Sequence, residues 1–319
     1  MEKVGLMTSR SVQRAVVAAL PWVLLAIGTW LVVSQVSRPA FLIKAGDVKA
    51  RVGCIALAMT AIVISGGIDL SVGSMLALCS VVMASLWQSG LSPAIAAVIA
   101  VAVGVLAGAG NGGLVIFGLS PLVATLATMA FYRGLAVTLA GGQKITKFET
   151  EPMIDPDLFG WPGEYWFLAV VFVVALAAIH FTRFGRWCFA IGDNPVAARY
   201  AAVPVRRTQF WLYVASGFVT GVLAVIYTLR KGANPEEHAG VELEAIACVV
   251  VGGTLITGGR GGITWTLLGI MVVSSLDMGL KLLSSSVSFF TAEARLMVIG
   301  LLLILVAVAN KRVAGDAER

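Results

Sequence analysis

Apolar residues of this chain fall in long blocks, and short connectors between the blocks carry most of the charged side chains. An α-helix needs roughly 20 apolar residues to cross a hydrocarbon core of about 30 Å. Because most blocks approach that length and show no amphipathic stripe, the pattern predicts an all-α integral membrane protein with about ten transmembrane helices. The expected helices cover residues 15–33, 52–65, 72–86, 93–117, 122–140, 166–181, 210–229, 245–251, 263–283 and 296–309.

Two of the expected helices, 52–65 and 245–251, are too short to cross a membrane as straight helices. Each runs into a glycine-rich element, which covers 66–73 in the first case and 252–259 in the second. The two elements share a pattern of two glycines, two residues, an aliphatic residue, Ser or Thr, one residue and a final glycine. We therefore expect two broken spans. The shared pattern indicates either an internal duplication or chance similarity among the 35 glycines.

Composition supports a membrane location. Apolar residues make up 59% of the chain, charged residues make up 13%, and the mean hydropathy is +0.93, which lies outside the usual range of soluble domains. The net charge of +6 could suggest a nucleic-acid ligand, but the basic residues lie in connectors instead of along one face. We therefore expect membrane lipid as a partner, no nucleic acid, and a single polytopic transmembrane domain over residues 1–319.

The connector 182–207 predicts the orientation of the chain, because basic residues are enriched in cytoplasmic loops. With about ten spans, a cytoplasmic 182–207 connector also places both termini in the cytoplasm. The basic stretch 38–51 conflicts with this topology, since it falls on the outer side. The charged residues of the connector are Arg183, Arg186, Arg199, Arg206 and Arg207, with Asp193 as the single acid.

The same connector contains the pattern of a short helix. Asn194 is a favourable N-cap, and Pro195 suits the first helical position, where its missing N–H leaves no hydrogen bond unmade. Ala197 and Ala198 favour helix and allow another surface to approach closely. A short basic helix of this kind would dock on a partner; the alternative is a plain loop whose arginines only set the topology.

Asp69 lies in the first glycine-rich element, at a depth where an ionised side chain costs about 2.5 to 3.5 kcal/mol. Its carboxylate either accepts hydrogen bonds from backbone N–H groups that the helix break leaves free or faces a polar pathway. Uncharged polar residues in neighbouring spans either contact a hydroxylated solute or join helices. The candidate pathway residues are Asp69, Ser71, Asn111, Thr125 and Thr128.

Five further ionisable residues lie near helix ends. Arg133, Asp277 and Lys281 are expected to anchor outer ends, and the spacing of Asp277 and Lys281 allows an ion pair within one helix. Glu242 and Glu244 precede the short span 245–251, where negative charge complements a helix N-terminus.

The sequence lacks catalytic and metal-binding patterns. Its four cysteines have neither disulfide-framework nor zinc-site spacing, and His180 and His238 have no partner pattern for catalysis. It contains no G-x-x-x-x-G-K-[ST] phosphate-binding loop. We therefore expect no catalytic residue, no metal site and no cofactor bound by this chain, so that any use of ATP requires a partner.

Three glycines spaced four residues apart, Gly104, Gly108 and Gly112, lie on one stripe of the expected helix 93–117. Glycine stripes let helix backbones approach closely in lipid. The stripe predicts a tight helix–helix contact.

In their order along the chain, several motifs resemble the permease subunits of bacterial ABC importers for simple sugars of the ribose, galactose, arabinose and xylose type, and of the autoinducer-2 type. The resemblance covers most of the chain. The motifs that carry it are ISGGIDLSVG (64–73), PLVATL (121–126), RGL (133–135), TRFG (182–185), AIG (190–192), NPVAA (194–198), ELEAIA (242–247), GGT (252–254) and GGRG (258–261).

This resemblance implies a non-enzymatic permease subunit in a bacterial cytoplasmic (inner) membrane. Two permease copies would form the pathway, a cytoplasmic ABC ATPase would use ATP and Mg²⁺, and a periplasmic binding protein would deliver a monosaccharide. The region around residues 192–199 would be the coupling helix that docks on the ATPase. The residues assigned to ATPase coupling are Arg183, Gly185, Gly192, Asn194, Ala197, Ala198 and Arg199.

The chain departs from the family pattern at three places. Asp193 stands where the family often has glycine, and a stretch ending at Pro204 replaces the glycine usually found after the paired alanines. The segment 276–285 lacks the asparagine pair often seen there. These departures leave open the detailed docking surface and the solute preference.

A secondary transporter coupled to protons or sodium is the alternative function, with Asp69 or Asp277 as its ion site. An intramembrane enzyme would need paired acids, a Ser-His pair or a metal-ligand set within the spans, and the sequence has none.

Overall fold

The computed structural model describes residues 19, 21–30, 47–146 and 159–283, and scattered positions between 291 and 305. Both termini lie outside this part. The expected helix 15–33 is described at residues 19 and 21–30, which are helical, and the expected helix 296–309 is described only at scattered positions, which are also helical. Within it the chain is helical, and the β-type pairing is one isolated antiparallel bridge between Ile145 and Ala233. The helices are α3 (Asp47–Ile64), α4 (Val72–Gln88), α5 (Pro93–Ile116), α6 (Pro121–Leu139), α7 (Gly163–Phe181), α8 (Arg183–Asp193), α9 (Pro195–Tyr200), α10 (Val205–Lys231), α11 (Val241–Val251) and α12 (Ile263–Leu283).

Five of the described helices are long and apolar enough to cross a membrane, namely α5, α6, α7, α10 and α12. Helices α4 and α11 are shorter, with 17 and 11 residues. The all-helical architecture is confirmed for the described residues, whereas the count of about ten spans and the internal duplication are not confirmed and stay predictions.

Two predicted boundaries were wrong for one physical reason. Helix α3 starts at Asp47, and α10 starts at Val205, five residues before the expected positions in each case. Charged residues in the first turns of both helices had been assigned to connectors. With 18 residues, α3 is about 27 Å long at 1.5 Å per residue, so it is much less truncated than the sequence suggested.

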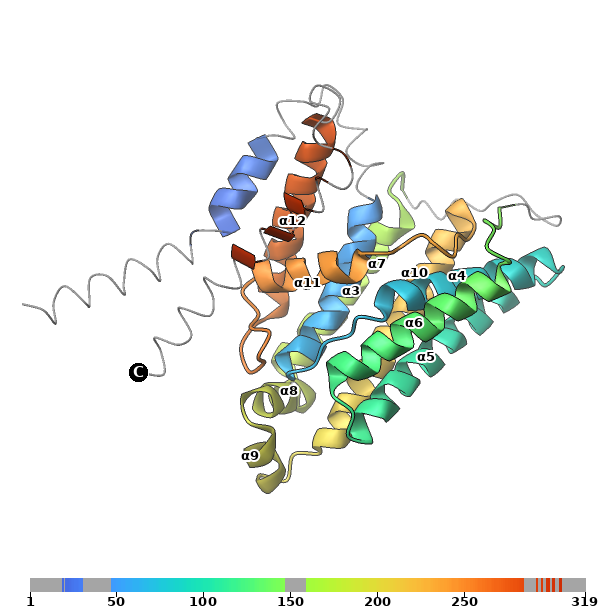
Figure 1. Ribbon diagram of the computed structural model, residues 1–319. Coiled ribbons are helices and arrows are strands. Elements are labelled where there is room, and N and C mark those ends of the chain that lie inside the picture. The colour runs from blue at the N-terminus through green and yellow to red at the C-terminus, as the bar shows by residue number, and fades with distance from the viewer. Residues whose placement is uncertain are drawn as a thin grey trace, which may run out of the picture.

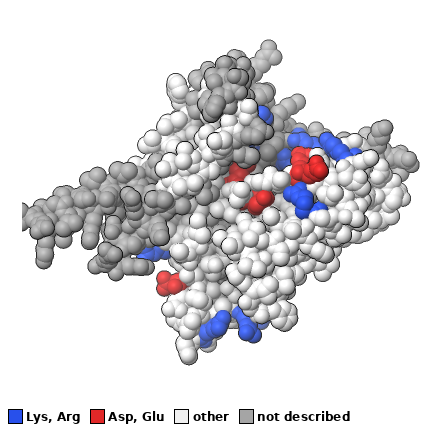
Figure 2. Space-filling model, in the orientation of Figure 1, with Lys and Arg blue, Asp and Glu red and all other residues white. Residues whose placement is uncertain are grey.

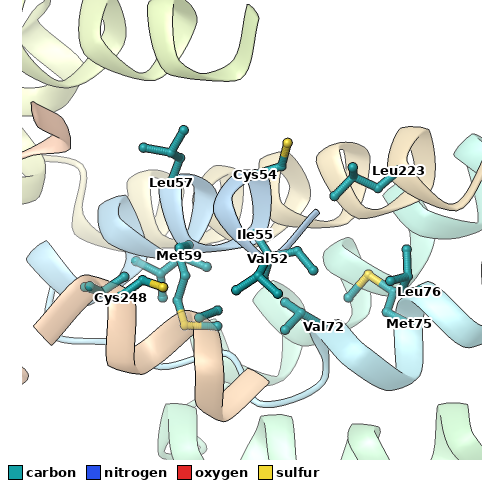
Figure 3. Close-up of a cluster of buried hydrophobic side chains, with 14 of the residues drawn as sticks. Val52, Cys54, Ile55, Leu57, Met59, Val72, Met75, Leu76, Leu223 and Cys248 are labelled. Atoms are coloured by element: carbon teal, nitrogen blue, oxygen red, sulfur yellow. The ribbon is translucent and has the colours of Figure 1, made fainter. Parts of the chain in front are cut away.

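The helices form two groups that meet along α3 and α10 (Figure 1). One group contains α4, α5, α6 and α10, and the other contains α3, α7, α11 and α12. Apolar side chains from α3, α4, α10 and α11 meet between the groups, as Figure 3 shows for Ile55, Val72, Leu223 and Cys248. Helices α3 and α4 are therefore central and are covered on most sides by other helices.

The predicted glycine stripe packs α5 tightly against α10. A Cβ atom added to Gly108 would lie 2.3 Å from the carbonyl oxygen of Tyr213, and one added to Gly104 would lie 2.5 Å from that of Gly217. No larger side chain fits there without separating the two helices. The expected tight helix–helix contact is confirmed, and its partner is α10.

Large apolar side chains cover the outer faces of α5, α6 and α7. Such an extended apolar surface is unsuited to water and suited to contact with lipid tails. Examples of these exposed side chains are Val98, Leu106, Val123, Phe131, Val170 and Val173.

Candidate functional site

Residues 65–71, between α3 and α4, form a non-helical segment that runs through the protein interior (Figure 1). Asp69 is fully buried in it. One carboxylate oxygen accepts hydrogen bonds from the backbone N–H of Ser71 at 3.0 Å and from its hydroxyl at 2.7 Å, and the other accepts from the Ser216 hydroxyl at 3.2 Å. The expectation that Asp69 accepts from backbone N–H in the helix break is confirmed.

The hydrogen bonds continue from Ser71 into α5 and α6. The Asn111 side-chain amide donates to the Ser71 hydroxyl at 2.7 Å. The Tyr132 hydroxyl donates to the carbonyl of Ala107 at 2.9 Å and to the Asn111 side-chain oxygen at 3.3 Å. This polar network therefore joins the broken segment to three helices, because Ser216 adds α10.

The backbone of the broken segment is held from two sides at Ile68. Its carbonyl oxygen accepts from the Thr125 hydroxyl at 3.3 Å and from the Tyr213 hydroxyl at 3.4 Å. Thr128, one turn further along α6, donates to the carbonyl of Thr125 at 3.2 Å. Because backbone groups at membrane depth need internal partners, these side chains make a non-helical segment possible there.

The structure thus brings all five candidate pathway residues to one region of the interior. It also shows that their polar atoms hydrogen-bond within the protein, so contact with a solute stays a prediction. Sequence analysis missed Ser216, Tyr132 and Tyr213. A signal existed for Ser216, because it lies with Gly217, Thr220 and Gly221 on a small and polar stripe of α10.

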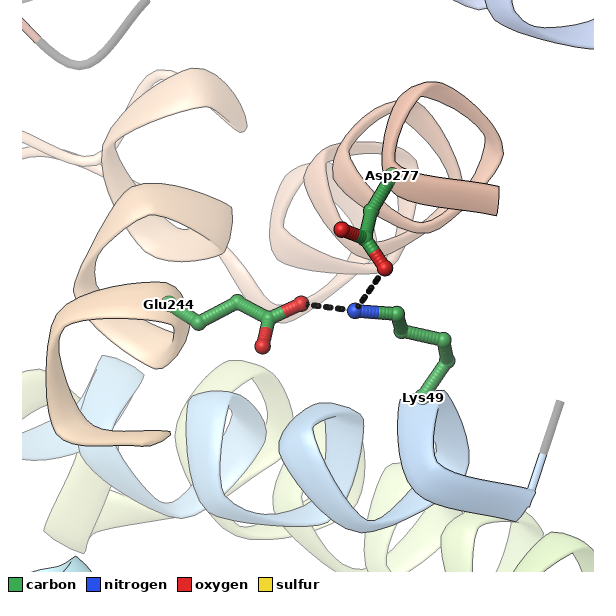
Figure 4. Close-up of polar contacts among 3 residues, drawn as sticks. All are labelled: Lys49, Glu244 and Asp277. Atoms are coloured by element: carbon green, nitrogen blue, oxygen red, sulfur yellow. Dashed lines mark hydrogen bonds and ion pairs between the residues drawn. The ribbon is translucent and has the colours of Figure 1, made fainter. Parts of the chain in front are cut away.

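A cluster of charged residues joins α3, α11 and α12 at the N-terminal end of α3, where Lys49 lies (Figure 4). The Lys49 ammonium forms ion pairs with Glu244 and, at 2.7 Å, with Asp277. The link from Asp277 to Lys49 was not predicted from the sequence, in which Lys49 falls in a connector, and the pairing of Asp277 with Lys281 stays a prediction. Glu242 follows its prediction, since its carboxylate accepts from the backbone N–H of Gly240 at the start of α11.

Arg133 contacts the loop between α10 and α11. Its guanidinium donates to the carbonyl oxygens of Pro235 at 2.6 Å and Glu237 at 2.9 Å. Arg133 therefore anchors α6 to a defined partner, the loop between α10 and α11, through these two hydrogen bonds.

His238, in the same loop, is buried against Tyr227, with ring centroids 4.6 Å apart, and the Arg51 guanidinium lies 4.5 Å from the Tyr227 ring. Burial lowers the pKa of His238 to about 3, and the positive charges of Arg51, Arg133 and Lys231 act in the same direction. His238 is therefore a neutral packing residue at physiological pH. Sequence analysis gave it no role, and its burial was not visible in the pattern.

The basic connector 182–207 folds into two short helices, α8 and α9, at one end of the molecule. Thr182 caps α8 by accepting from the N–H of Phe184 at 3.1 Å. Asn194 caps α9 by accepting from the N–H groups of Val196 and Ala197, each at 3.0 Å, and Pro195 is the first residue of α9. The predicted short helix is confirmed together with its cap, and α8 is an additional helix that the sequence pattern did not predict.

The seven residues assigned to coupling divide into two sets. Arg183, Asn194, Ala197 and Arg199 are exposed, and basic side chains gather at this end in Figure 2. Ala198 is only 4% exposed and packs with Ile191 and Val205, and Gly185 is also buried. Gly192 is partly exposed and lies against Ile64. A bulky residue at position 198 would therefore disturb the α8–α9–α10 contact before it reached a partner.

The described residues contain no group of His, Cys, Asp and Glu that could hold a metal ion. All four cysteines are buried and free. Neither finding adds a chemical function to the polar network or to the α8–α9 pair.

These features define a multi-pass membrane protein of the transporter class. They are an apolar helical bundle, a hydrogen-bonded helix break at membrane depth and a pair of basic helices at one end. The chain belongs to the family described as branched-chain amino acid transport system / permease component, whose profile matches residues 50–307.

Similar proteins are permeases of import systems. The chain is 36% identical over 266 residues to the ribose import permease protein of Bacillus subtilis (strain 168), covering 82% of this chain and 81% of that protein. It is 35% identical over 269 residues to the ribose import permease protein of Escherichia coli (strain K12), covering 81% and 82%. The autoinducer 2 import system permease protein of Yersinia enterocolitica is 35% identical over 269 residues, covering 81% and 80%. No solved structure matches the chain.

Proposed function

We propose that this chain forms the translocation pathway of an ATP-driven importer for a monosaccharide, a pentose or hexose. The observation that carries the proposal is the 35–36% identity, over about four fifths of each chain, to permeases named for ribose import. The family description mentions branched-chain amino acids, but these individual relatives favour a hydroxylated solute.

In this proposal, each end of the molecule contacts a different partner, and the partners are those that the permease family implies. A cytoplasmic ABC ATPase, which uses ATP and Mg²⁺, docks on the exposed basic face of α8 and α9, where Arg183 and Arg199 lie. A periplasmic binding protein delivers the solute at the opposite end, where Ile145 pairs with Ala233. A second permease copy completes the pathway, lipid surrounds it, and both termini lie in the cytoplasm.

Asp69, Ser71, Asn111, Thr125 and Thr128 contribute to this pathway by shaping its wall. Their hydrogen bonds with one another and with neighbouring helices support this role. Solute selection in this proposal rests mainly with the binding protein.

Reconstitution in liposomes tests the proposal. The permease is reconstituted with its ATPase and its binding protein, and uptake of radiolabelled D-ribose is measured with and without ATP, with leucine as the matched amino-acid solute. We expect ribose uptake that requires ATP, the ATPase and the binding protein, and no comparable leucine uptake.

Two results would contradict the proposal. Uphill ribose uptake by the permease alone, driven by a proton or sodium gradient, would establish the secondary-transporter alternative. ATP-driven uptake of leucine without uptake of ribose would move the solute class to amino acids.

A further inference from the structure

Gly192, near the end of α8, touches both helix breaks at once. A Cβ atom added to Gly192 would lie 1.9 Å from the carbonyl oxygen of Ile64 and 2.4 Å from the backbone nitrogen of Gly259. Ile64 is the last residue of α3, and Gly259 lies in the turns between α11 and α12. The two breaks are also bonded to each other, because the Gly259 N–H donates to the Ile64 carbonyl at 2.9 Å.

Two more glycines complete this contact. A Cβ atom added to Gly258 would lie 2.9 Å from both the Cα of Gly192 and the backbone nitrogen of Gly66. The atoms that meet are therefore backbone atoms from three segments far apart in the sequence. We call this contact the glycine junction and define it by Ile64, Gly66, Gly192, Gly258 and Gly259.

The glycine junction is stiff in a way that ordinary side-chain packing is not. Side chains between two helices can change rotamer and absorb a small displacement, whereas backbone atoms in direct contact cannot turn away. A displacement of α8 is therefore passed to the end of α3 and to the α11–α12 turns together.

The segment 66–73 continues from the glycine junction towards the other side of the molecule. It is held midway at Ile68 and Asp69 by side chains of α6 and α10. At its far end a Cβ atom added to Gly73 would lie 2.6 Å from the carbonyl oxygen of His238 and 2.4 Å from the Glu242 carboxylate. The segment thus connects the end of α8 to the α10–α11 loop through close contacts.

We infer that Gly192 is a positioning residue of the transport cycle, and that the glycine junction passes the motion of α8 into both helix breaks and along 66–73 to the opposite end. This inference rests on the proposed function, in which an ATPase moves α8 and α9. It also reassigns Gly192, which the family resemblance had placed on the ATPase-docking surface, to a contact inside the membrane domain.

The test uses the reconstituted complex of permease, ATPase and binding protein, with D-ribose as the probe. Gly192→Ala places a methyl group in the glycine junction, and Gly134→Ala is the matched control, because a Cβ there meets nothing within 4 Å. For Gly192→Ala we expect normal co-purification with the ATPase and basal ATP hydrolysis within twofold of wild type. Ribose uptake and the stimulation of hydrolysis by ribose-loaded binding protein fall at least tenfold.

Other outcomes have separate meanings. Uptake by Gly192→Ala within twofold of Gly134→Ala overturns the inference. The variant Arg199→Glu, on the exposed face, serves as the reference for lost ATPase docking. If Gly192→Ala loses co-purification with the ATPase to the same extent, the inference is also overturned, since Gly192 would then belong to the docking surface. Failure of the wild-type complex to take up ribose with ATP is the failure of the proposed function instead.

Hydrogen–deuterium exchange of the wild-type complex decides the question even where Gly192→Ala does not fold. Trapping the ATPase with a non-hydrolysable ATP analogue should change exchange in peptides covering 64–73 and 254–262 together with 190–196. The turn at 89–92, which lies outside these contacts, is the control and should not change. A change confined to 190–196 would refute transmission through the glycine junction.

Discussion

At the scale of single residues, Asp69 shows how a carboxylate can serve the backbone of a membrane protein. It is buried and accepts three hydrogen bonds, two from Ser71 and one from Ser216. A buried donor left without its acceptor costs about 1 to 3 kcal/mol. The network is therefore sensitive to loss of the oxygens, and less sensitive to loss of the charge.

We expect Asp69→Ala to lower the melting temperature of the detergent-purified permease by several degrees and to reduce its yield. Asp69→Asn keeps one acceptor oxygen for Ser71 and places a side-chain amide near Ser216, so most of the stability should remain. Thermal unfolding followed by tryptophan fluorescence checks both. Equal losses in the two variants would mean that the negative charge itself is required.

Ala202 carries local backbone strain after α9. Its φ of +59° lies in the left-handed region, which costs a residue with a Cβ about 1 to 2 kcal/mol. It falls in the stretch ending at Pro204, where the family resemblance led us to expect a glycine.

Ala202→Gly should therefore stabilise the α8–α9 pair by about 0.5 to 1 kcal/mol, after part of the gain is lost to the greater freedom of glycine in the unfolded chain. Hydrogen exchange of amides 195–203 measures this as slower exchange. The neighbouring Ala201 has φ −83°, so Ala201→Gly is the control and should speed exchange. The same response in both variants would contradict the strain argument.

At the scale of elements, α5 offers a direct comparison between a packed and an open glycine. A Cβ at Gly108 would overlap the Tyr213 carbonyl of α10, whereas a Cβ at Gly113 would meet nothing within 4 Å. Both glycines lie within the same helix.

Gly108→Ala should destabilise the permease by about 2 kcal/mol or more, because α5 and α10 must separate. Gly113→Ala should be neutral or stabilising by up to about 1 kcal/mol, since alanine favours helix. Thermal unfolding of both variants under identical detergent conditions is the measurement. Similar melting temperatures would show that the α5–α10 contact is looser than the structure indicates.

At the scale of the whole molecule, the basic α8–α9 pair and the Ile145–Ala233 bridge lie at opposite ends (Figure 1). We predict that the α8–α9 end faces the cytoplasm and that the Ile145–Ala233 end faces the periplasm. In a variant without native cysteines, Arg199→Cys should react with a membrane-impermeant maleimide only from the cytoplasmic side. Gln143→Cys, also exposed, should react only from the periplasmic side. Labelling of both positions from one side of intact cells would overturn the orientation.

Sequence patterns predicted the features that depend on local chemistry. The break around Asp69, the Asn194 cap and the close-packing stripe at Gly108 each follow from a few neighbouring residues. The features that sequence did not predict depend on distant partners. Lys49 lies in a helix and pairs with Glu244 and Asp277, Ser216 reaches Asp69 across 147 positions, and Ala198 turns inward.

The side chains that hold the broken segment also constrain how the protein can be made. Ile68 and Asp69 emerge from the ribosome long before Tyr213 and Ser216, which follow 145 and 147 residues later. At about 5 to 20 residues per second this interval is roughly 7 to 30 s. During that time the segment lacks its α10 partners, and its polar backbone cannot face lipid without cost. We therefore expect the segment 65–71 to enter the lipid only after α10 has been synthesised, and to stay at the insertion machinery or in water until then.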